Sequence, residues 1–238
     1  MPCSKSRPAG FVRRSPGSRG PDVQHGHFIT LEGGEGAGKS TLAKALAQRL
    51  RDGGASVVTT REPGGSPKAE AIREAILAGR IKQYGAFAEA LMFSAARIDH
   101  IDRLIRPALA QGNWVICDRF IDSTRVYQGV LGDIDASLLG ELEQVTIDGL
   151  MPELTLILDL DPEIGLARAA KRRSPGESVD RFEGEALAFH RKLRGAYLDI
   201  AGREPQRCVV IDAALPAEEL ADAAWSALRD RLPIGPES

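Results

Sequence analysis

Apolar and polar positions along the chain follow two periods, one typical of buried strands and one typical of helices. Five short runs rich in β-branched and aliphatic residues predict strands, and segments with a helical repeat follow them. The predicted strands are 27–32, 55–62, 113–119, 153–161 and 207–212. The predicted helices are 39–51, 67–78, 85–111, 134–147, one that begins at Pro162, 182–201 and 216–230. This alternation predicts an α/β fold in which helices cover both faces of a parallel sheet.

The first 26 residues differ from the rest of the chain in composition. They are rich in Pro, Gly, Ser and Arg, carry five cations against one anion, and show no helical period. Such a segment buries too little apolar surface to offset its ordering entropy, so residues 1–26 are expected to be a disordered basic tail. An organellar transit peptide and a start codon assigned too far upstream remain alternatives. No repeat or linker divides residues 27–238, which are predicted to form one domain.

Composition limits the partners of that domain. The net charge is −2 and hydrophobic residues make up 43%, as in an ordinary globular protein. With this net charge, general binding to nucleic acid is not expected. A membrane partner is not expected either, because no apolar run approaches the ~18 residues that span a bilayer. Cysteines 3, 117 and 208 are few, odd in number and widely spaced. Free thiols in a reducing, cytoplasmic setting are therefore expected.

A glycine-rich loop, GGEGAGKST, follows the first predicted strand and opens the first predicted helix. Gly33, Gly38, Lys39 and Ser40 fit the pattern G-x-x-x-x-G-K-[ST], in which backbone N–H groups cradle phosphate at a helix N-terminus. The lysine reaches the β- and γ-phosphates and the hydroxyl ligates Mg²⁺. The loop is therefore predicted to bind ATP with Mg²⁺ through Gly33, Gly34, Glu35, Gly36, Ala37, Gly38, Lys39, Ser40 and Thr41.

Other motifs are predicted to lie beside this loop, because ligands of parallel sheets bind at the carboxyl ends of the strands. Asp118 and Arg119 close the third strand, where a carboxylate suits Mg²⁺ and a guanidinium suits a phosphate. Phe93 and Arg97 are four residues apart and share a helix face, so a ring and a guanidinium lie side by side to contact a flat base. Core packing of Phe93 is the alternative.

Seven ordered blocks of sequence resemble the bacterial thymidylate kinase family. They are EGGEGAGKST, TREPGGS, EALMFSAAR, WVICDRF, DSTRVYQG, LTLILDLDPEIGLAR and DRFE, and they cover essentially residues 27–230. The resemblance implies a three-layer P-loop NTPase fold with a five-stranded parallel sheet, flanking helices and a short mobile lid at about 168–181. It implies transfer of the γ-phosphoryl group of ATP to dTMP, and a homodimer formed through the long helix near 85–111.

The resemblance also assigns roles to individual residues. Phe93 is expected to stack on thymine, Arg97 to bond its exocyclic oxygen, and Thr124 to face the base edge. Tyr127 is expected to lie against the sugar and exclude a 2′-hydroxyl. Acceptor phosphate is assigned to Arg61 and Arg119, and Glu35 is expected to reach the sugar or the metal-bound water.

The donor loop lacks an arginine, so the lid is expected to supply one. A cluster of cations, Arg168, Lys171, Arg172 and Arg173, precedes the sequence SPGESV. Either Arg172 or Arg173 is predicted to be the mobile catalytic arginine, and the sequence does not choose between them. Two other functions stay open at this stage: a different nucleoside or nucleotide kinase, and a P-loop nucleotide sensor without catalytic activity.

Overall fold

The computed structural model describes residues 26–172 and 182–234, and the elements below belong to those residues. Five strands form one sheet: β1 (Phe28–Gly33), β2 (Val57–Arg61), β3 (Trp114–Asp118), β4 (Leu154–Asp159) and β5 (Cys208–Asp212). All neighbouring strands are parallel and their order is β2-β3-β1-β4-β5. The five predicted strands and the parallel sheet are therefore confirmed. The carboxyl ends of all five strands lie along one edge of the sheet.

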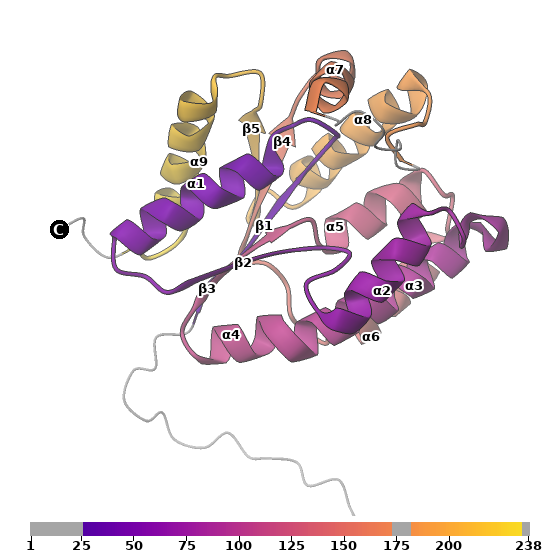
Figure 1. Cartoon of the computed structure of the whole chain (residues 1–238), viewed down its shortest axis with the longest axis horizontal. Helices are drawn as coiled ribbons and strands as arrows, with labels where there is room; N and C mark the ends of the chain where they lie inside the picture. The colour runs from indigo at the N-terminus through magenta and orange to yellow at the C-terminus, as the bar shows by residue number, and fades with distance from the viewer. Residues whose placement is uncertain (1–25, 173–181, 235–238) are drawn as a thin grey trace, which may run out of the picture.

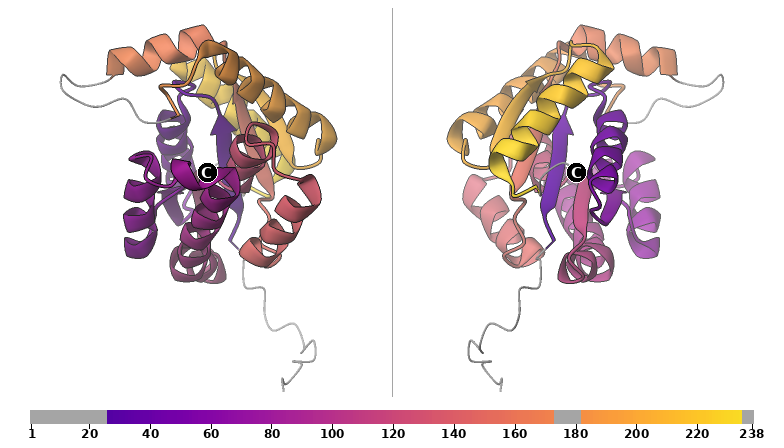
Figure 2. Two further views of the ribbon diagram at one scale, coloured as in Figure 1. Left: turned by 90° about the vertical axis from the view of Figure 1, so that its right-hand side faces the viewer. Right: turned by 90° about the vertical axis from the view of Figure 1, so that its left-hand side faces the viewer.

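Helices cover both faces of this sheet (Figures 1 and 2). The longer ones are α1 (Lys39–Asp52), α2 (Pro67–Leu77), α3 (Gly85–His100), α6 (Ala136–Ile147), α7 (Pro162–Arg172), α8 (Leu187–Arg203) and α9 (Ala217–Arg231). Short helical segments are η1 (Lys82–Tyr84), η2 (Ile101–Ile105), α4 (Arg106–Ala110), α5 (Ile121–Thr124) and η3 (Arg125–Val130). Helices α1 and α9 pack on one face through residues such as Leu46 and Leu228. The opposite face is covered by η2, α4 and α8, among others.

The sequence-based helices agree with the structure except near the site. The predicted helix 85–111 is a continuous run of α3, η2 and α4, with a π-helical turn at η2. The predicted helix 182–201 begins later, at Leu187. The helical segment at 121–130 was not predicted, because its polar sequence carries no clear apolar period. Helix α2 begins as expected, with Pro67 in its first turn and the Ser66 hydroxyl accepting from the N–H of Ala69.

The remaining sequence predictions about the whole chain are tested only in part. Cys117 and Cys208 are free and buried, whereas Cys3 lies outside the described residues. Within the described part of the chain, no helix has the length and apolar character needed to cross a bilayer. The expected tail, apart from residue 26, and most of the expected lid also fall outside the described residues.

Candidate functional site

The glycine-rich loop connects β1 to α1 and holds Lys39 against its own backbone. The Lys39 ammonium donates to the carbonyl oxygens of Gly33 (3.1 Å) and Gly34 (2.8 Å). Burial, and next the charge of Arg119, lowers the pKa of Lys39. The loop has no room for a side chain at Gly36, where a Cβ would lie 2.0 Å from the backbone oxygen of Gly165. The loop therefore presents a buried cation at the N-terminus of α1, as an anion site requires.

A hydroxyl and a carboxylate meet beside this loop. The Ser40 hydroxyl donates to Asp118 Oδ2 at 2.5 Å, which joins the start of α1 to the end of β3. Both groups offer the hard oxygen atoms that Mg²⁺ prefers, so this pair fits the predicted metal. No cluster of three or more metal-binding side chains was found among the described residues.

Arg119 lies next to the lysine of the loop. Its NH1 group donates to the Gly33 carbonyl oxygen (3.1 Å), the same oxygen that accepts from Lys39. Its NH2 group donates to Glu35 Oε1 at 2.8 Å. Although burial opposes ionisation, the charges of Arg119 and Lys39 lower the pKa of Glu35. The Arg119 backbone has a φ of 72°, in the left-handed region that non-glycine residues rarely occupy. Two cations thus converge on one backbone oxygen.

A cavity of about 140 Å³ opens on the other side of Arg119. Its lining includes Arg73, Phe93, Arg97, Arg119, Thr124 and Tyr127. The Tyr127 ring packs edge-on against Phe182 at 5.0 Å between centroids, and the Arg119 guanidinium lies 5.4 Å from the Tyr127 ring centre. Phe93 is only half-buried at this wall, so its ring faces the cavity and is not confined to the core. The cavity combines aromatic faces with several guanidinium groups.

Two residues show where the sequence-based site departs from this geometry. Arg61, expected to bind the acceptor phosphate, does not line the cavity; its half-exposed side chain pairs with Glu70 at 3.2 Å. Arg73 lines the cavity instead and donates to the carbonyl oxygen of Pro63 at 2.8 Å. Arg73 was missed because a basic residue inside a helical repeat resembles an ordinary solvent-facing residue.

Glu32, near the end of β1, holds the segment that follows β3 against β1 through hydrogen bonds. Its carboxylate accepts hydrogen bonds from the backbone N–H groups of Phe120 (2.8 Å) and Ser123 (3.2 Å) and from the Tyr197 hydroxyl (3.0 Å). Burial, reinforced by the charge of Asp122, raises the pKa of Glu32 from 4.5 to about 7. This role was not predicted, although Glu32 is the only charged residue within an apolar strand pattern.

This raised pKa predicts how stability depends on pH. Because the folded protein holds the Glu32 proton more tightly than the unfolded chain, the contribution of Glu32 to stability is full below pH 4.5 and is lost as pH rises through about 7. Relative to a Glu32→Gln variant, the wild type should lose roughly 2–3 kcal/mol of unfolding free energy between pH 5 and pH 8. Urea unfolding of both proteins across this range measures the difference, and parallel pH curves would contradict it.

A second group of charges, in ion pairs of Arg125 and Arg207, also holds the segment that follows β3, which comprises α5 and η3. Arg125 bonds Asp122 (3.1 Å), Glu143 (2.5 Å) and Glu204 (2.7 Å), and Arg207 bonds Asp122 again at 2.7 Å. These pairs join η3 and α5 to α6, to the end of α8 and to the start of β5. Arg125 had no role in the sequence analysis, and in the structure it supports the cavity wall from outside.

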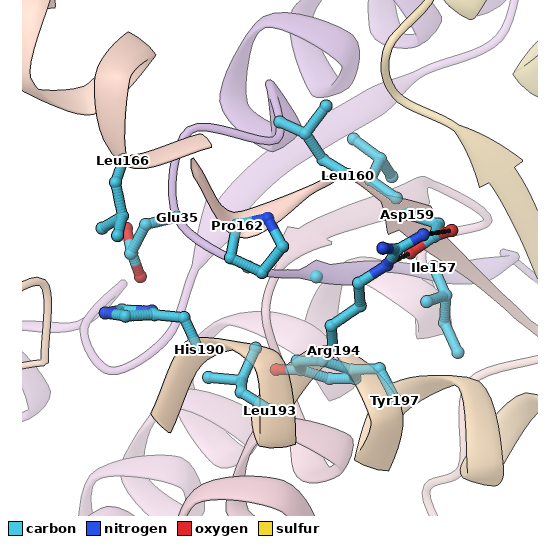
Figure 3. A pocket seen from close by; sticks show the side chains of 13 residues that line it. Glu35, Ile157, Asp159, Leu160, Pro162, Leu166, His190, Leu193, Arg194 and Tyr197 are labelled. Atoms are coloured by element: carbon cyan, nitrogen blue, oxygen red, sulfur yellow. Dashed lines mark hydrogen bonds and ion pairs between the residues drawn. The ribbon is translucent and has the colours of Figure 1, made fainter. Parts of the chain in front are cut away.

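A smaller cavity of about 20 Å³ lies behind the loop, between β4, α7 and α8 (Figure 3). Glu35 and His190 point toward one another across it, and Arg194 forms a two-point ion pair with Asp159 at 2.6 and 2.8 Å. The buried His190 Nε2 has no hydrogen-bond partner among the described residues. His190 thus adds to the groups whose charges lower the pKa of Glu35 against the effect of burial.

The predicted lid is described only at its beginning. Arg168 donates to the carbonyl oxygen of Ala213 at 2.8 Å, which fixes it to the body of the protein. Arg172 is exposed at the end of α7. Burial alone would raise the pKa of Glu35, and the charge of Arg172 helps to lower it, together with the larger effects of Arg119, Lys39 and His190. Arg173, the other candidate, lies outside the described residues.

Comparisons with known proteins agree with this geometry. The sequence profile of the family described as Thymidylate kinase matches residues 31–224. The chain is 60% identical over 208 residues to a thymidylate kinase of Rhodopseudomonas palustris, covering 87% of this chain and 90% of the relative. It is 56% identical over 213 residues to one of Nitrobacter hamburgensis, covering 90% and 92%. A crystal structure of thymidylate kinase from Ehrlichia chaffeensis matches with a TM-score of 0.69 and 33% identity, covering 86% of this chain and 99% of that chain. The chain therefore belongs to the thymidylate kinase family of phosphotransferases.

Proposed function

We propose that the protein transfers the γ-phosphoryl group of ATP to dTMP, giving ADP and dTDP, with Mg²⁺ at Ser40 and Asp118. The observation that carries this proposal is the shared contact of Lys39 and Arg119 with the Gly33 carbonyl oxygen. This contact brings the two cations together between the loop and the cavity, which supports a donor-side role for Lys39 and an acceptor-side role for Arg119. Two nucleotides bound on either side would meet there with their phosphates in line.

The proposed mechanism needs positioning and charge neutralisation rather than a general base, because the acceptor phosphate is already ionised. Lys39 binds the transferring phosphoryl group from the donor side. Arg119 and Arg73 bind the acceptor phosphate. A Mg²⁺ ion held by Ser40 and Asp118 would supply additional positive charge to neutralise the phosphates. Arg172, or Arg173 beyond the described residues, supplies the remaining cation from the lid.

The acceptor nucleoside is assigned to the other end of the cavity. Phe93 stacks on the thymine ring, while Arg97 and Thr124 contact the base edge. Tyr127 lies against the sugar. Glu35 reaches the sugar or metal-bound water when the acceptor phosphate replaces it at Arg119. The aromatic and guanidinium groups that line this cavity support these roles.

A coupled ADP-release assay with dTMP, UMP, CMP, AMP and GMP tests the assignment. We expect turnover with dTMP to exceed that with each of the others. Equal rates with UMP or AMP would remove the thymine assignment. Binding of ATP without a phosphorylated nucleotide product would instead favour the non-catalytic sensor considered from the sequence.

The different positions of Arg73 and Arg61 lead to a paired prediction. We expect Arg73→Ala to raise the KM for dTMP about tenfold or more, because a charged hydrogen bond to phosphate is lost. Arg61→Ala is expected to change that KM less than threefold, since Arg61 pairs with Glu70 outside the cavity. Steady-state kinetics of both variants decides between the two arginines, and the reverse order of effects would restore Arg61 as the phosphate ligand.

We also propose a homodimer formed through α3 and α6. These packed helices expose apolar residues at helical spacing: Phe87, Leu91 and Ile98 on α3, and Leu138 and Val145 on α6. Val145 is 75% exposed, an unusual environment for an apolar side chain on a folded monomer. A second copy of the chain packed on this face would bury both stripes.

The proposed interface predicts that a charged substitution within it will lower the mass of the protein in solution. Leu91→Glu places a charge in the centre of the α3 stripe, and we expect it to convert the dimer to a monomer. Ile164→Glu is the matched control, because Ile164 is equally exposed (45%) but lies on α7, away from the stripe. Light scattering coupled to size-exclusion chromatography measures the mass of each. A monomeric wild type, or a dimeric Leu91→Glu protein, would contradict the proposed interface.

A further inference from the structure

A chain of buried hydrogen bonds runs from β2 through α3 to the wall of the acceptor cavity. The Thr60 hydroxyl lies 2.7 Å from His100 Nε2, and His100 Nδ1 lies 3.0 Å from Glu62 Oε1. The other oxygen of Glu62 accepts from Arg97 Nε at 2.6 Å. The side chains of Arg97, Glu62 and His100 are 2%, 3% and 0% exposed. These side chains are therefore largely shielded from bulk solvent.

Chemistry fixes the direction of each hydrogen bond. A carboxylate paired with Arg97 only accepts, so the proton between His100 and Glu62 sits on Nδ1 of the imidazole. In the neutral ring, Nε2 is then the acceptor of the Thr60 hydroxyl proton. Every polar atom of the His100 ring is thereby satisfied. Removing His100 would leave Glu62 Oε1 buried without this donor, and the carboxylate would rotate or shift to find another.

Arg97 is held on one side and open on the other. Its Nε donates to Glu62, one terminal nitrogen donates to the Thr124 hydroxyl (3.0 Å), and the other donates to the Phe120 carbonyl oxygen (3.0 Å). A guanidinium has five N–H groups in a fixed plane, so two of them keep no acceptor among the described residues. Arg97 also lines the cavity. The plane of these two remaining donors is set by the bonds to Glu62, Thr124 and Phe120, of which the bond to Glu62 is the shortest.

The turn after β2 is shaped around His100. Gly65 has a φ of +84°, and a Cβ at this position would lie 2.3 Å from His100 Nε2 and 2.6 Å from the Thr60 hydroxyl oxygen. The absence of a side chain at Gly65 therefore lets the turn close directly over the imidazole. The position of His100 is fixed from the strand, the turn and the helix together.

We propose that His100 is a positioning residue for recognition of the acceptor base. It acts through Glu62 to orient Arg97, so that the two remaining N–H groups face the exocyclic 4-oxygen of the pyrimidine ring. This inference rests on the proposed function and deepens it. Specificity for a 4-keto over a 4-amino pyrimidine thus depends on a histidine that does not line the cavity.

Kinetics of His100 variants tests the proposal. His100→Leu removes both hydrogen bonds, and we expect the KM for dTMP to rise about tenfold while the KM for ATP and kcat change less than twofold. His100→Asn keeps a donor near the Nδ1 position and should recover most of the loss. Thr60→Val, which retains the shape of the side chain, should give a smaller rise of about threefold and remains informative if His100→Leu fails to fold.

A second substrate provides a readout that general destabilisation does not move. 5-Methyl-dCMP differs from dTMP at position 4, where an amino group replaces the oxygen, and at N3, which loses its proton. Arg97 offers only hydrogen-bond donors, which the 4-oxygen of dTMP can accept and the 4-amino group of 5-methyl-dCMP cannot. Correct placement of Arg97 therefore favours dTMP. We expect the ratio of kcat/KM for dTMP over 5-methyl-dCMP to fall about tenfold in His100→Leu.

Ile105→Ala is the control variant, because Ile105 is a buried core residue of the same helical run that lies outside the hydrogen-bonded chain. It should lower stability and leave the substrate ratio unchanged. An unchanged ratio in His100→Leu, or an equal rise in the KM for dTMP and ATP, would overturn the role of His100. A wild-type protein without dTMP kinase activity would instead overturn the proposed function on which this inference rests.

Discussion

Replacing Lys39 with methionine is expected to lower kcat by about a thousandfold or more, on the scale observed when a charge that stabilises a transferring phosphoryl group is removed. The Lys39 ammonium lies against the carbonyl oxygens of Gly33 and Gly34, which hold it at the loop. Methionine retains most of the length of the side chain but none of its charge.

Stability should respond in the opposite direction to activity. Burial lowers the pKa of Lys39, which means that folding places this ammonium in an unfavourable environment. The methionine variant is therefore expected to be at least as resistant to thermal unfolding as the wild type. Lys44→Met is the matched control on the same helix, because Lys44 is exposed and should affect neither property. Coupled kinetics and thermal melts measure both, and a Lys39→Met enzyme within tenfold of wild-type kcat would refute the role of this lysine.

Replacing Arg119 with alanine is the second change with a large expected effect. Arg119 joins the Gly33 carbonyl oxygen to the Glu35 carboxylate and lines the acceptor cavity. Its loss removes the proposed ligand of the acceptor phosphate and the ion pair with Glu35. We expect kcat/KM for dTMP to fall by about a thousandfold, with a much smaller change in ATP affinity.

The backbone at position 119 allows function and folding to be separated. Because its φ of 72° costs a non-glycine residue roughly 1–2 kcal/mol, an Arg119→Gly variant should be about 1 kcal/mol more stable than Arg119→Ala. Both should be equally inactive. Arg49→Ala, at the exposed end of α1, is a suitable control for removing an arginine. Retained dTMP turnover in both Arg119 variants would show that another cation binds the acceptor phosphate.

The sequence predicted the fold well because apolar periodicity and strand ends are local features. The loop at Gly33 to Thr41 follows the first strand, and Asp118 and Arg119 lie at the end of the third. Both could be placed at the carboxyl edge of the sheet without knowing the order in which the strands pair. The π-helical segment at Arg125–Val130 could not be predicted in this way, because ion pairs of Arg125 with Glu143 and Glu204 hold it. Such pairs join residues far apart in the sequence.

The contents of the acceptor site were harder to predict than its location. Arg61 and Glu62 are adjacent at the end of β2, yet Glu62 turns inward to Arg97 while Arg61 pairs outside with Glu70. Side-chain direction at the end of a strand depends on the turn that follows, and no period in the sequence reports it. The same limit hid Arg73 and His100, whose roles depend on contacts across the fold.

The close approach of Gly36 to Gly165 restricts how the loop and α7 can evolve and move. A Cβ on Gly36 would strike the Gly165 oxygen at 2.0 Å, and a Cβ on Gly165 would strike the Glu35 oxygen at 2.3 Å. Both obstacles are main-chain atoms, so no change of rotamer relieves either collision, and no compensating substitution at the other position would help. A side chain at either position should consequently force the phosphate loop and the base of α7 apart.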